Sequence, residues 1–158
     1  MQIELILYED QYAAIFKSLN LEWLDKYNLT ESHDLEVLDD PRGTILNNGG
    51  IIYLAKAGDE IVGSAALIKE PNDVYELAKM AVTPAWRGKG ISRVLIEKCL
   101  DTARSWNAKK IMLYSNSQLQ TALKLNEKYG FRHVPVENAP FLTADVKMEL
   151  IISGTDLA

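Results

Sequence analysis

The sequence predicts a mixed α/β fold for this chain of 158 residues. Apolar residues make up 47% of it, which is enough to bury a substantial core. The hydrophobic period is helical before the NNGG turn at residues 47–50, alternates after it, and becomes helical again after residue 88. The expected order of elements, β-α-α-β-β-β-α-β-α-β-β, differs from the regular alternation of a parallel sheet. We therefore expect one mixed α/β domain over residues 1–158.

The first half of the chain is expected to hold one strand and two helices. Residues 3–8 form an apolar run that indicates a strand, and Asp10 is a suitable N-cap for a helix that begins near Gln11. A second, shorter helix is expected from about residue 32 to residue 39. Pro41 enforces the stop, because proline disfavours helical geometry in the residue before it.

The second half is expected to alternate strands with two further helices. Apolar residues four apart predict one helix between Gly88 and Trp106, and Gly130 is a suitable left-handed C-cap for a helix over residues 119–130. Cys99 lies on the apolar stripe of the first of these helices, where packing is the simpler role. Strands are expected at residues 51–57 and 61–70 (a hairpin), 74–82, 110–115, 131–136 and 143–152.

Composition excludes several classes of protein. The net charge of -5 argues against general nucleic-acid binding, and no apolar stretch is long enough to suggest a membrane span. The single cysteine excludes an intrachain disulfide framework and is typical of a cytoplasmic protein. Residues 1–10 lack the basic region of a secretory signal. His33 and His133 show no metal-ligand spacing, so we expect no metal site.

The stretch AVTPAWRGKGIS, residues 81–92, is the strongest functional signal. It joins a strand to a helix through two glycines, and it holds basic residues but no carboxylate. Unpaired N–H groups at a helix N-terminus attract anions, and glycines let a phosphate approach them closely. Neither the Walker pattern nor the dinucleotide fingerprint fits, because Gly90 and Arg93 occupy positions where those motifs need other residues. An ordinary connection with solvated basic residues is the alternative.

With these residues in view, the sequence resembles the GNAT superfamily of acetyl-CoA-dependent N-acyltransferases. The family pattern is matched by Met80-Ala81-Val82-Thr83-Pro84 followed by Arg87-Gly88-Lys89-Gly90-Ile91-Ser92. A second block, with Asn116, Ala122 and residues 125–131, resembles the family's later region. The resemblance covers roughly residues 50–150. It implies a mostly antiparallel mixed sheet of about seven strands flanked by about four helices, with acetyl-CoA and an amine acceptor as substrates; relatives often form homodimers.

The resemblance also implies a role for each matched residue. Backbone N–H groups of residues 88–93 would hold the coenzyme A pyrophosphate. Nearby basic side chains would reach the remaining phosphate charge, including the ribose 3′-phosphate. Backbone groups of one strand would pair with the pantetheine arm, and an asparagine on the neighbouring strand would hydrogen-bond to it. The implied set is Met80, Val82, Arg87, Gly88, Lys89, Gly90, Ile91, Ser92, Arg93 and Asn116.

The chain departs from the family pattern at two positions. Ser92 stands where the family prefers glycine or alanine, and its small side chain leaves the backbone N–H intact. Asn126 stands where the family usually has the tyrosine that protonates the departing thiolate. Asparagine has no proton of useful pKa to give. Tyr114 and Tyr129 are alternative acids, although packing with a locally satisfied hydroxyl is the simpler reading of each.

Glu76 is our candidate general base. It is the only acid in residues 74–82, and even spacing predicts that its side chain shares one face with Met80 and Val82. A carboxylate there would deprotonate the amine, and a backbone N–H of Met80 or Val82 would stabilise the oxyanion. A solvated glutamate at the sheet edge is the alternative. Trp23 and Tyr27 either line the acceptor site or pack in the helical core.

Three functions are compatible with these observations. The first is acetyl transfer from acetyl-CoA to a primary amine of a small molecule or peptide. The second is a regulatory module that binds acyl-CoA without turnover, which Asn126 keeps open. The third is a protein that binds a nucleotide phosphate. The sequence does not identify the acceptor amine.

Overall fold

The computed structural model describes residues 2–152, which contain a seven-stranded sheet in the order β1-β2-β3-β4-β5-β7-β6. Neighbouring strands run antiparallel, except that β4 and β5 are parallel. This arrangement confirms the mixed, mostly antiparallel sheet. The strands are β1 (Ile3–Leu7), β2 (Ile51–Ala57), β3 (Glu60–Glu70), β4 (Val74–Val82), β5 (Lys110–Ser115), β6 (Arg132–Val134) and β7 (Val146–Ile151).

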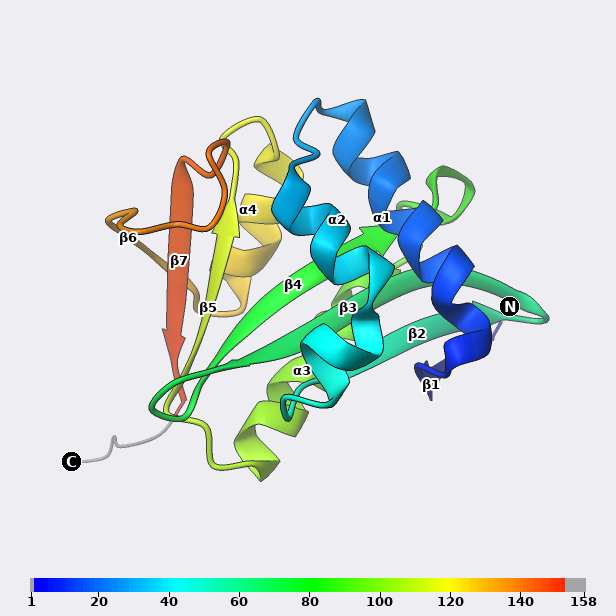
Figure 1. Ribbon diagram of the computed structural model, residues 1–158, viewed down its shortest axis with the longest axis horizontal. Coiled ribbons are helices and arrows are strands. Elements are labelled where there is room, and N and C mark those ends of the chain that lie inside the picture. The colour runs from blue at the N-terminus through cyan, green and yellow to red at the C-terminus, as the bar shows by residue number, and fades with distance from the viewer. Residues whose placement is uncertain (1, 153–158) are drawn as a thin grey trace.

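Four main helices cover the two faces of the sheet. Helices α1 (Ala13–Lys26) and α2 (Ser32–Asp39) lie over one face, and α3 (Ile91–Ser105) and α4 (Gln120–Lys128) lie over the other (Figure 1). Each face has its own apolar core. Phe16 and Ile52 belong to the core beneath α1, whereas Leu95 and Leu67 belong to the core beneath α3. Burial on both faces of the sheet fixes its register, because a slip by one residue would exchange the two cores.

The N-terminal region contains two turns that the periodicity did not predict. A 3₁₀ helix, Asp10–Tyr12, precedes α1, and the Asp10 side chain caps neither helix but accepts a hydrogen bond of 2.9 Å from Arg42 Nε. After α2, Pro41 begins a wide helical turn, Arg42–Leu46. Proline is tolerated at such a start because its fixed φ is already helical and its missing N–H would have no partner there.

A β-bulge in β4 overturns one expectation about the site. Ala78 pairs with Ala66 and Ala81 with Ser64, so that two residues of β4, Lys79 and Met80, lie opposite one residue of β3. Lys79 has a left-handed backbone, with φ of 53°. An extra residue reverses the alternation of side chains beyond it.

The prediction that Glu76 shares a face with Met80 and Val82 is therefore wrong. Tyr75 and Leu77 face the core beneath α3 before the bulge, and Met80 and Val82 face it after the bulge. Glu76 faces the side of α1 and α2.

The ladder between β4 and β5 is short. It joins Val74–Glu76 to Lys110–Met112 and goes no further, although both strands continue. Figure 1 shows the two strands close together at one end and separated at the other. The edge of β4 beyond Glu76 therefore lacks a neighbouring strand, and its backbone groups are accessible to an extended ligand.

Candidate active site

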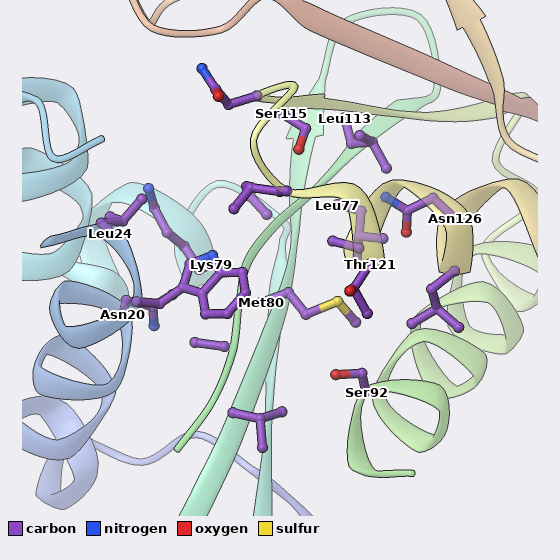
Figure 2. A pocket seen from close by; sticks show the side chains of 18 of the residues that line it. Asn20, Leu24, Leu77, Lys79, Met80, Ser92, Leu113, Ser115, Thr121 and Asn126 are labelled. Atoms are coloured by element: carbon purple, nitrogen blue, oxygen red, sulfur yellow. The ribbon is translucent and has the colours of Figure 1, made fainter. Parts of the chain in front are cut away.

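A cavity of about 730 Å³ lies where β4 and β5 separate, and its lining comes from all four main helices. Its size is within the range typical of ligand sites. Figure 2 shows Asn20, Leu24 and Lys79 on one side, Ser92 and Asn126 on the other, and Met80 between them. Of the site residues expected from the sequence, all line this cavity except Lys89.

The glycine turn has the geometry of an anion site. Gly88 and Gly90 have φ of 76° and 83°, a left-handed conformation that glycine adopts without strain, and Gly90 is the N-cap of α3. Within residues 2–152, none of the backbone N–H groups of residues 88–93 donates to another group of the chain. A Cβ built on either glycine would meet no atom within 4 Å. The turn is therefore open to a bulky ligand.

The Arg87 side chain contacts both β4 and α1. Its Nε donates to the Val82 carbonyl at 3.0 Å, and its guanidinium carbon lies 4.8 Å from the centre of the Trp23 ring on α1. These contacts bind the end of β4 to α1. Arg87 Nη2 is buried without a hydrogen-bond partner within residues 2–152, so the expectation that the Arg87 side chain reaches a phosphate stays a prediction. Lys89 and Arg93 are exposed near the turn, and their expected contact with phosphate likewise stays a prediction.

The Asn116 side chain is also engaged within the protein. Its Nδ2 donates to the Thr143 carbonyl at 2.7 Å, and its Oδ1 accepts from the Gln118 backbone at 3.0 Å. The side chain thereby connects the end of β5 to the loop before β7. A ligand in the cavity would meet the backbone of Asn116 more readily than this committed amide.

Glu76 is the buried carboxyl group of the cavity wall that has no hydrogen-bond partner among residues 2–152. Glu76 is only 7% exposed, and no group in the described part of the chain donates a hydrogen bond to its carboxyl group. Burial, reinforced by the negative charge of Glu70, raises the pKa of Glu76 to about 7, although Lys79 acts in the opposite direction. A carboxyl group with this pKa can accept and release a proton near neutral pH.

Lys79 and Asp34 form a buried ion pair that the sequence did not reveal. Lys79 Nζ lies 2.6 Å from Asp34 Oδ1, and the two side chains are 6% and 4% exposed. Asp34 belongs to α2 and meets β4 only through the tertiary fold. Lys79 offered a weak signal as the only base in a mostly apolar strand.

The remaining residues considered in the sequence analysis either line the cavity or have partners away from it. Trp23, Tyr27, Tyr114 and Asn126 line the cavity. The Tyr129 hydroxyl instead donates to Glu97 at 2.5 Å, and Tyr129 does not line the cavity. Cys99 is fully buried, and burial raises the pKa of its thiol to about 12, which excludes a thiolate nucleophile at neutral pH.

Residues 2–152 contain no candidate metal cluster and no candidate membrane span. No group of three or more His, Cys, Asp or Glu side chains there has a metal-binding arrangement. No helix there has both the length and the apolar character that crossing a membrane requires.

Comparison with known proteins identifies the family. The model of the acetyltransferase (GNAT) family matches residues 12–131. The chain belongs to this family.

Curated relatives share part of the chain. An N-acetyltransferase of Mycobacterium tuberculosis is 34% identical over 105 residues, a match that covers 66% of this chain and 63% of that protein. An N-acetyltransferase of Bacillus subtilis is 30% identical over 115 residues, a match that covers 71% of this chain and 74% of that protein. Both relatives are uncharacterized. Human N-acetylaspartate synthetase is 34% identical over 87 residues, covering 54% of this chain and 29% of that protein.

Solved structures show the same fold. A GNAT-family acetyltransferase of Staphylococcus aureus superposes with a TM-score of 0.89 at 23% identity, covering 96% of this chain and all of that one. The PaiA N-acetyltransferase of Thermoplasma acidophilum, solved with coenzyme A, gives a TM-score of 0.74 at 17% identity, covering 96% and 99%. At these identities the comparison establishes the fold alone.

Proposed function

We propose that this protein transfers the acetyl group of acetyl-CoA to a primary amine, with Glu76 as general base. One observation carries the proposal: a single cavity connects open backbone amides at the start of α3 to a buried, unpartnered carboxyl group on β4. The amides suit a diphosphate, and the carboxyl group suits an ammonium that must lose a proton.

The coenzyme would be bound along the opening between β4 and β5. The N–H groups of residues 88–93 would hold its pyrophosphate, and Lys89 and Arg93 would meet the remaining phosphate charge. The pantetheine arm would lie beside the unpaired edge of β4. Met80 has no partner residue in the ladder, so its backbone N–H is our candidate donor to the thioester carbonyl. The bound coenzyme supplies the activated acetyl group.

Glu76 would act on the acceptor from the side of α1 and α2. An alkyl ammonium has a pKa near 10.4, so only a small fraction of it is nucleophilic at neutral pH. A carboxylate whose pKa is about 7 is the better matched base, and a positioned base typically contributes about 10²- to 10⁴-fold to the rate. Because the bulge turns the Met80 side chain toward α3, the side chains of Glu76 and Met80 lie on opposite faces of β4. The Met80 backbone N–H would lie at the strand edge between these faces, where the amine and the thioester can meet.

The test is release of free coenzyme A thiol from acetyl-CoA with a panel of amino acids, polyamines, aminoglycosides and peptides. We expect at least one amine to raise thiol release, and Glu76→Gln to lower kcat/KM for that amine by about 10²- to 10⁴-fold. In the wild type, the acidic limb of the pH profile should fall near pH 7. Glu70→Gln removes a like charge near Glu76 and should move that limb to lower pH.

A second function is favoured by Asn126, which lines the cavity where the family has tyrosine. In that case the protein would bind acyl-CoA as a regulatory module and would release no thiol with any amine at any pH. Calorimetry with coenzyme A gives binding under both hypotheses, so thiol release separates them. If turnover occurs, an increased rate in Asn126→Tyr would indicate that protonation of the thiolate limits it. ATP that bound without competition from coenzyme A would contradict both.

A further inference from the structure

The cavity wall has a charge opposite to that of the chain. The chain carries a formal charge of -5, but basic side chains outnumber acidic ones around the cavity. Part of this positive charge, on α3 and α4, lies on the side that would face coenzyme A. The rest lies at the acceptor end. The charged lining residues are Lys26, Asp34, Glu76, Lys79, Arg87, Arg93, Lys124 and Lys128.

The acceptor end offers no free carboxylate to a second cation. Asp34 is engaged through both oxygens: Oδ1 accepts from Lys79 Nζ at 2.6 Å, and Oδ2 accepts from the Glu31 backbone N–H at 2.9 Å. Glu76 has no partner, but the reaction needs it to take the proton of the amine. A polyamine would bring further ammonium groups into a wall that has nothing to pair them with, at the cost of burying unpaired charge.

Lys79 has hydrogen-bond donors left for a ligand, as does Arg87, whose Nη2 is buried and has no hydrogen-bond partner within residues 2–152. The Lys79 ammonium has three N–H donors, and of these only one has an oxygen partner, on Asp34, within residues 2–152. Its other close neighbour is the ring of Phe141, whose centre is 5.3 Å from Nζ. Lys79 lines the cavity, so a bound ligand can supply the missing acceptor.

The position of Lys79 is fixed by an unusual backbone. A lysine with φ of 53° is held in a conformation that costs energy for any residue with a Cβ. Ser64 Oγ donates to the Lys79 carbonyl at 2.7 Å, and Asn20 Nδ2 donates to Ser64 Oγ at 3.1 Å. Three buried polar residues thus hold Lys79 in the wall: Asn20 and Ser64 fix its backbone carbonyl, and Asp34 binds its ammonium. Strain maintained in this way typically marks a functional position.

We propose that the acceptor carries a carboxylate beside its amine, as an amino acid does, and that Lys79 binds that carboxylate. The inference rests on the proposed acetyl transfer and specifies its substrate class. Lys79 pairs with the acceptor carboxylate while keeping its bond to Asp34, and the acceptor ammonium lies toward Glu76, which accepts its proton. Lys79 is the specificity-determining residue, and Glu76 remains the base.

The experiment compares each standard amino acid with its own carboxamide as acceptor, by thiol release from acetyl-CoA. The two members of a pair differ in the negative charge and in the pKa of the α-ammonium, which is lower in the amide, so kcat/KM is compared per unprotonated amine. We expect the best amino acid to exceed its amide in kcat/KM by about 10- to 100-fold, as for a hydrogen bond to a charged group. Lys79→Met should bring that ratio close to one, and Lys79→Arg should retain it.

Two controls separate recognition from folding. Lys26→Met removes an exposed cation of the same cavity and should leave the ratio unchanged. Because Lys79→Met leaves Asp34 buried without its cation, the double variant Lys79→Met/Asp34→Asn is measured beside it, and coenzyme A binding by calorimetry verifies that both are folded. The double variant should lose the ratio as completely as the single one.

The outcomes distinguish this inference from the proposed function. If amines are acetylated but amides equal or exceed the acids, or if Lys79→Met lowers both equally, the carboxylate site is wrong and acetyl transfer stands. If no amine releases thiol, the proposed function fails. In that case, titration of N-acetyl amino acids and their amides into the protein loaded with coenzyme A decides the inference: equal affinity overturns it, and preference for the acids that Lys79→Met abolishes supports it.

Discussion

Ionisation of the Glu76 carboxyl group lowers the stability of the folded state, because the residue is buried. The residue is buried, and nothing in the described chain hydrogen-bonds to its carboxyl group. Burial raises its pKa to about 7, above the ordinary value of 4.5. Between these two values the folded state holds a proton that the unfolded state has released. The stability contributed by Glu76 is therefore present below about pH 4.5 and is lost as pH rises through about 7.

Glu76→Gln should make the protein more stable at alkaline pH while reducing activity. The glutamine amide cannot ionise, so the variant does not lose stability as pH rises through about 7. One pKa unit corresponds to about 1.4 kcal/mol, so the gain at pH 8 should approach about 3 kcal/mol, or roughly 6–12 °C in Tm for a chain of this size. Thermal unfolding at pH 5 and pH 8 checks this, and the gain should be small at pH 5. A gain of equal size at both pH values would show that packing, and not ionisation, causes it.

Glu76 was singled out from the sequence as a candidate base, but the face of β4 on which its side chain lies was not predicted. Alternation along a strand predicts which face a side chain occupies until a bulge interrupts it. No residue type in β4 indicated the bulge, because a lysine, Lys79, adopts a left-handed conformation that favours glycine. The same limit applies to Asp34, whose place beside Lys79 depends on how α2 packs against β4. The partners of Arg87 and Asn116 depend in the same way on contacts distant in sequence, with Trp23 and Thr143.

At the scale of elements, the sequence predicted helix boundaries and turns correctly where one glycine determines the local backbone geometry. Gly130 ends α4 in a left-handed conformation as expected: its N–H donates to the Glu127 carbonyl, and the Phe131 N–H donates to the Asn126 carbonyl. Gly88 and Gly90 likewise form the expected turn before α3. The separation of β4 from β5 was not predictable from either strand alone, since the ladder between them covers only part of each strand and its length depends on the tertiary fold.

Gly88→Ala tests whether the turn before α3 binds coenzyme A. Gly88 and Gly58 both have left-handed backbones and open space around them, but only Gly88 lines the cavity. Alanine at either position should cost about 1 kcal/mol of stability from backbone strain. Only Gly88→Ala should also weaken coenzyme A binding, by tenfold or more, because the new methyl group obstructs the ligand. Calorimetry and thermal unfolding of the two variants check this, and equal coenzyme A affinity in both would place the phosphate elsewhere.

At the scale of the whole molecule, the cavity connects the two layers of helices. Its lining includes Trp23 and Asp34 from the layer of α1 and α2, and Ser92 and Asn126 from the layer of α3 and α4. A ligand that fills it contacts side chains from both layers of helices. We therefore expect the chain to unfold as one unit, and coenzyme A to stabilise that unit as a whole.

Coenzyme A at 100 times its dissociation constant should stabilise the folded state by about 2.7 kcal/mol, which corresponds to roughly 5–10 °C in Tm. A single calorimetric transition should move intact to higher temperature, and fluorescence from Trp23 on α1 should report the same midpoint as circular dichroism. Trp86→Phe and Trp106→Phe isolate that fluorescence, since the chain holds three tryptophans. Two transitions, with coenzyme A raising the midpoint of only one, would contradict the expectation of one domain. They would show that the α1 and α2 layer, which carries Asp34, folds independently of the coenzyme site.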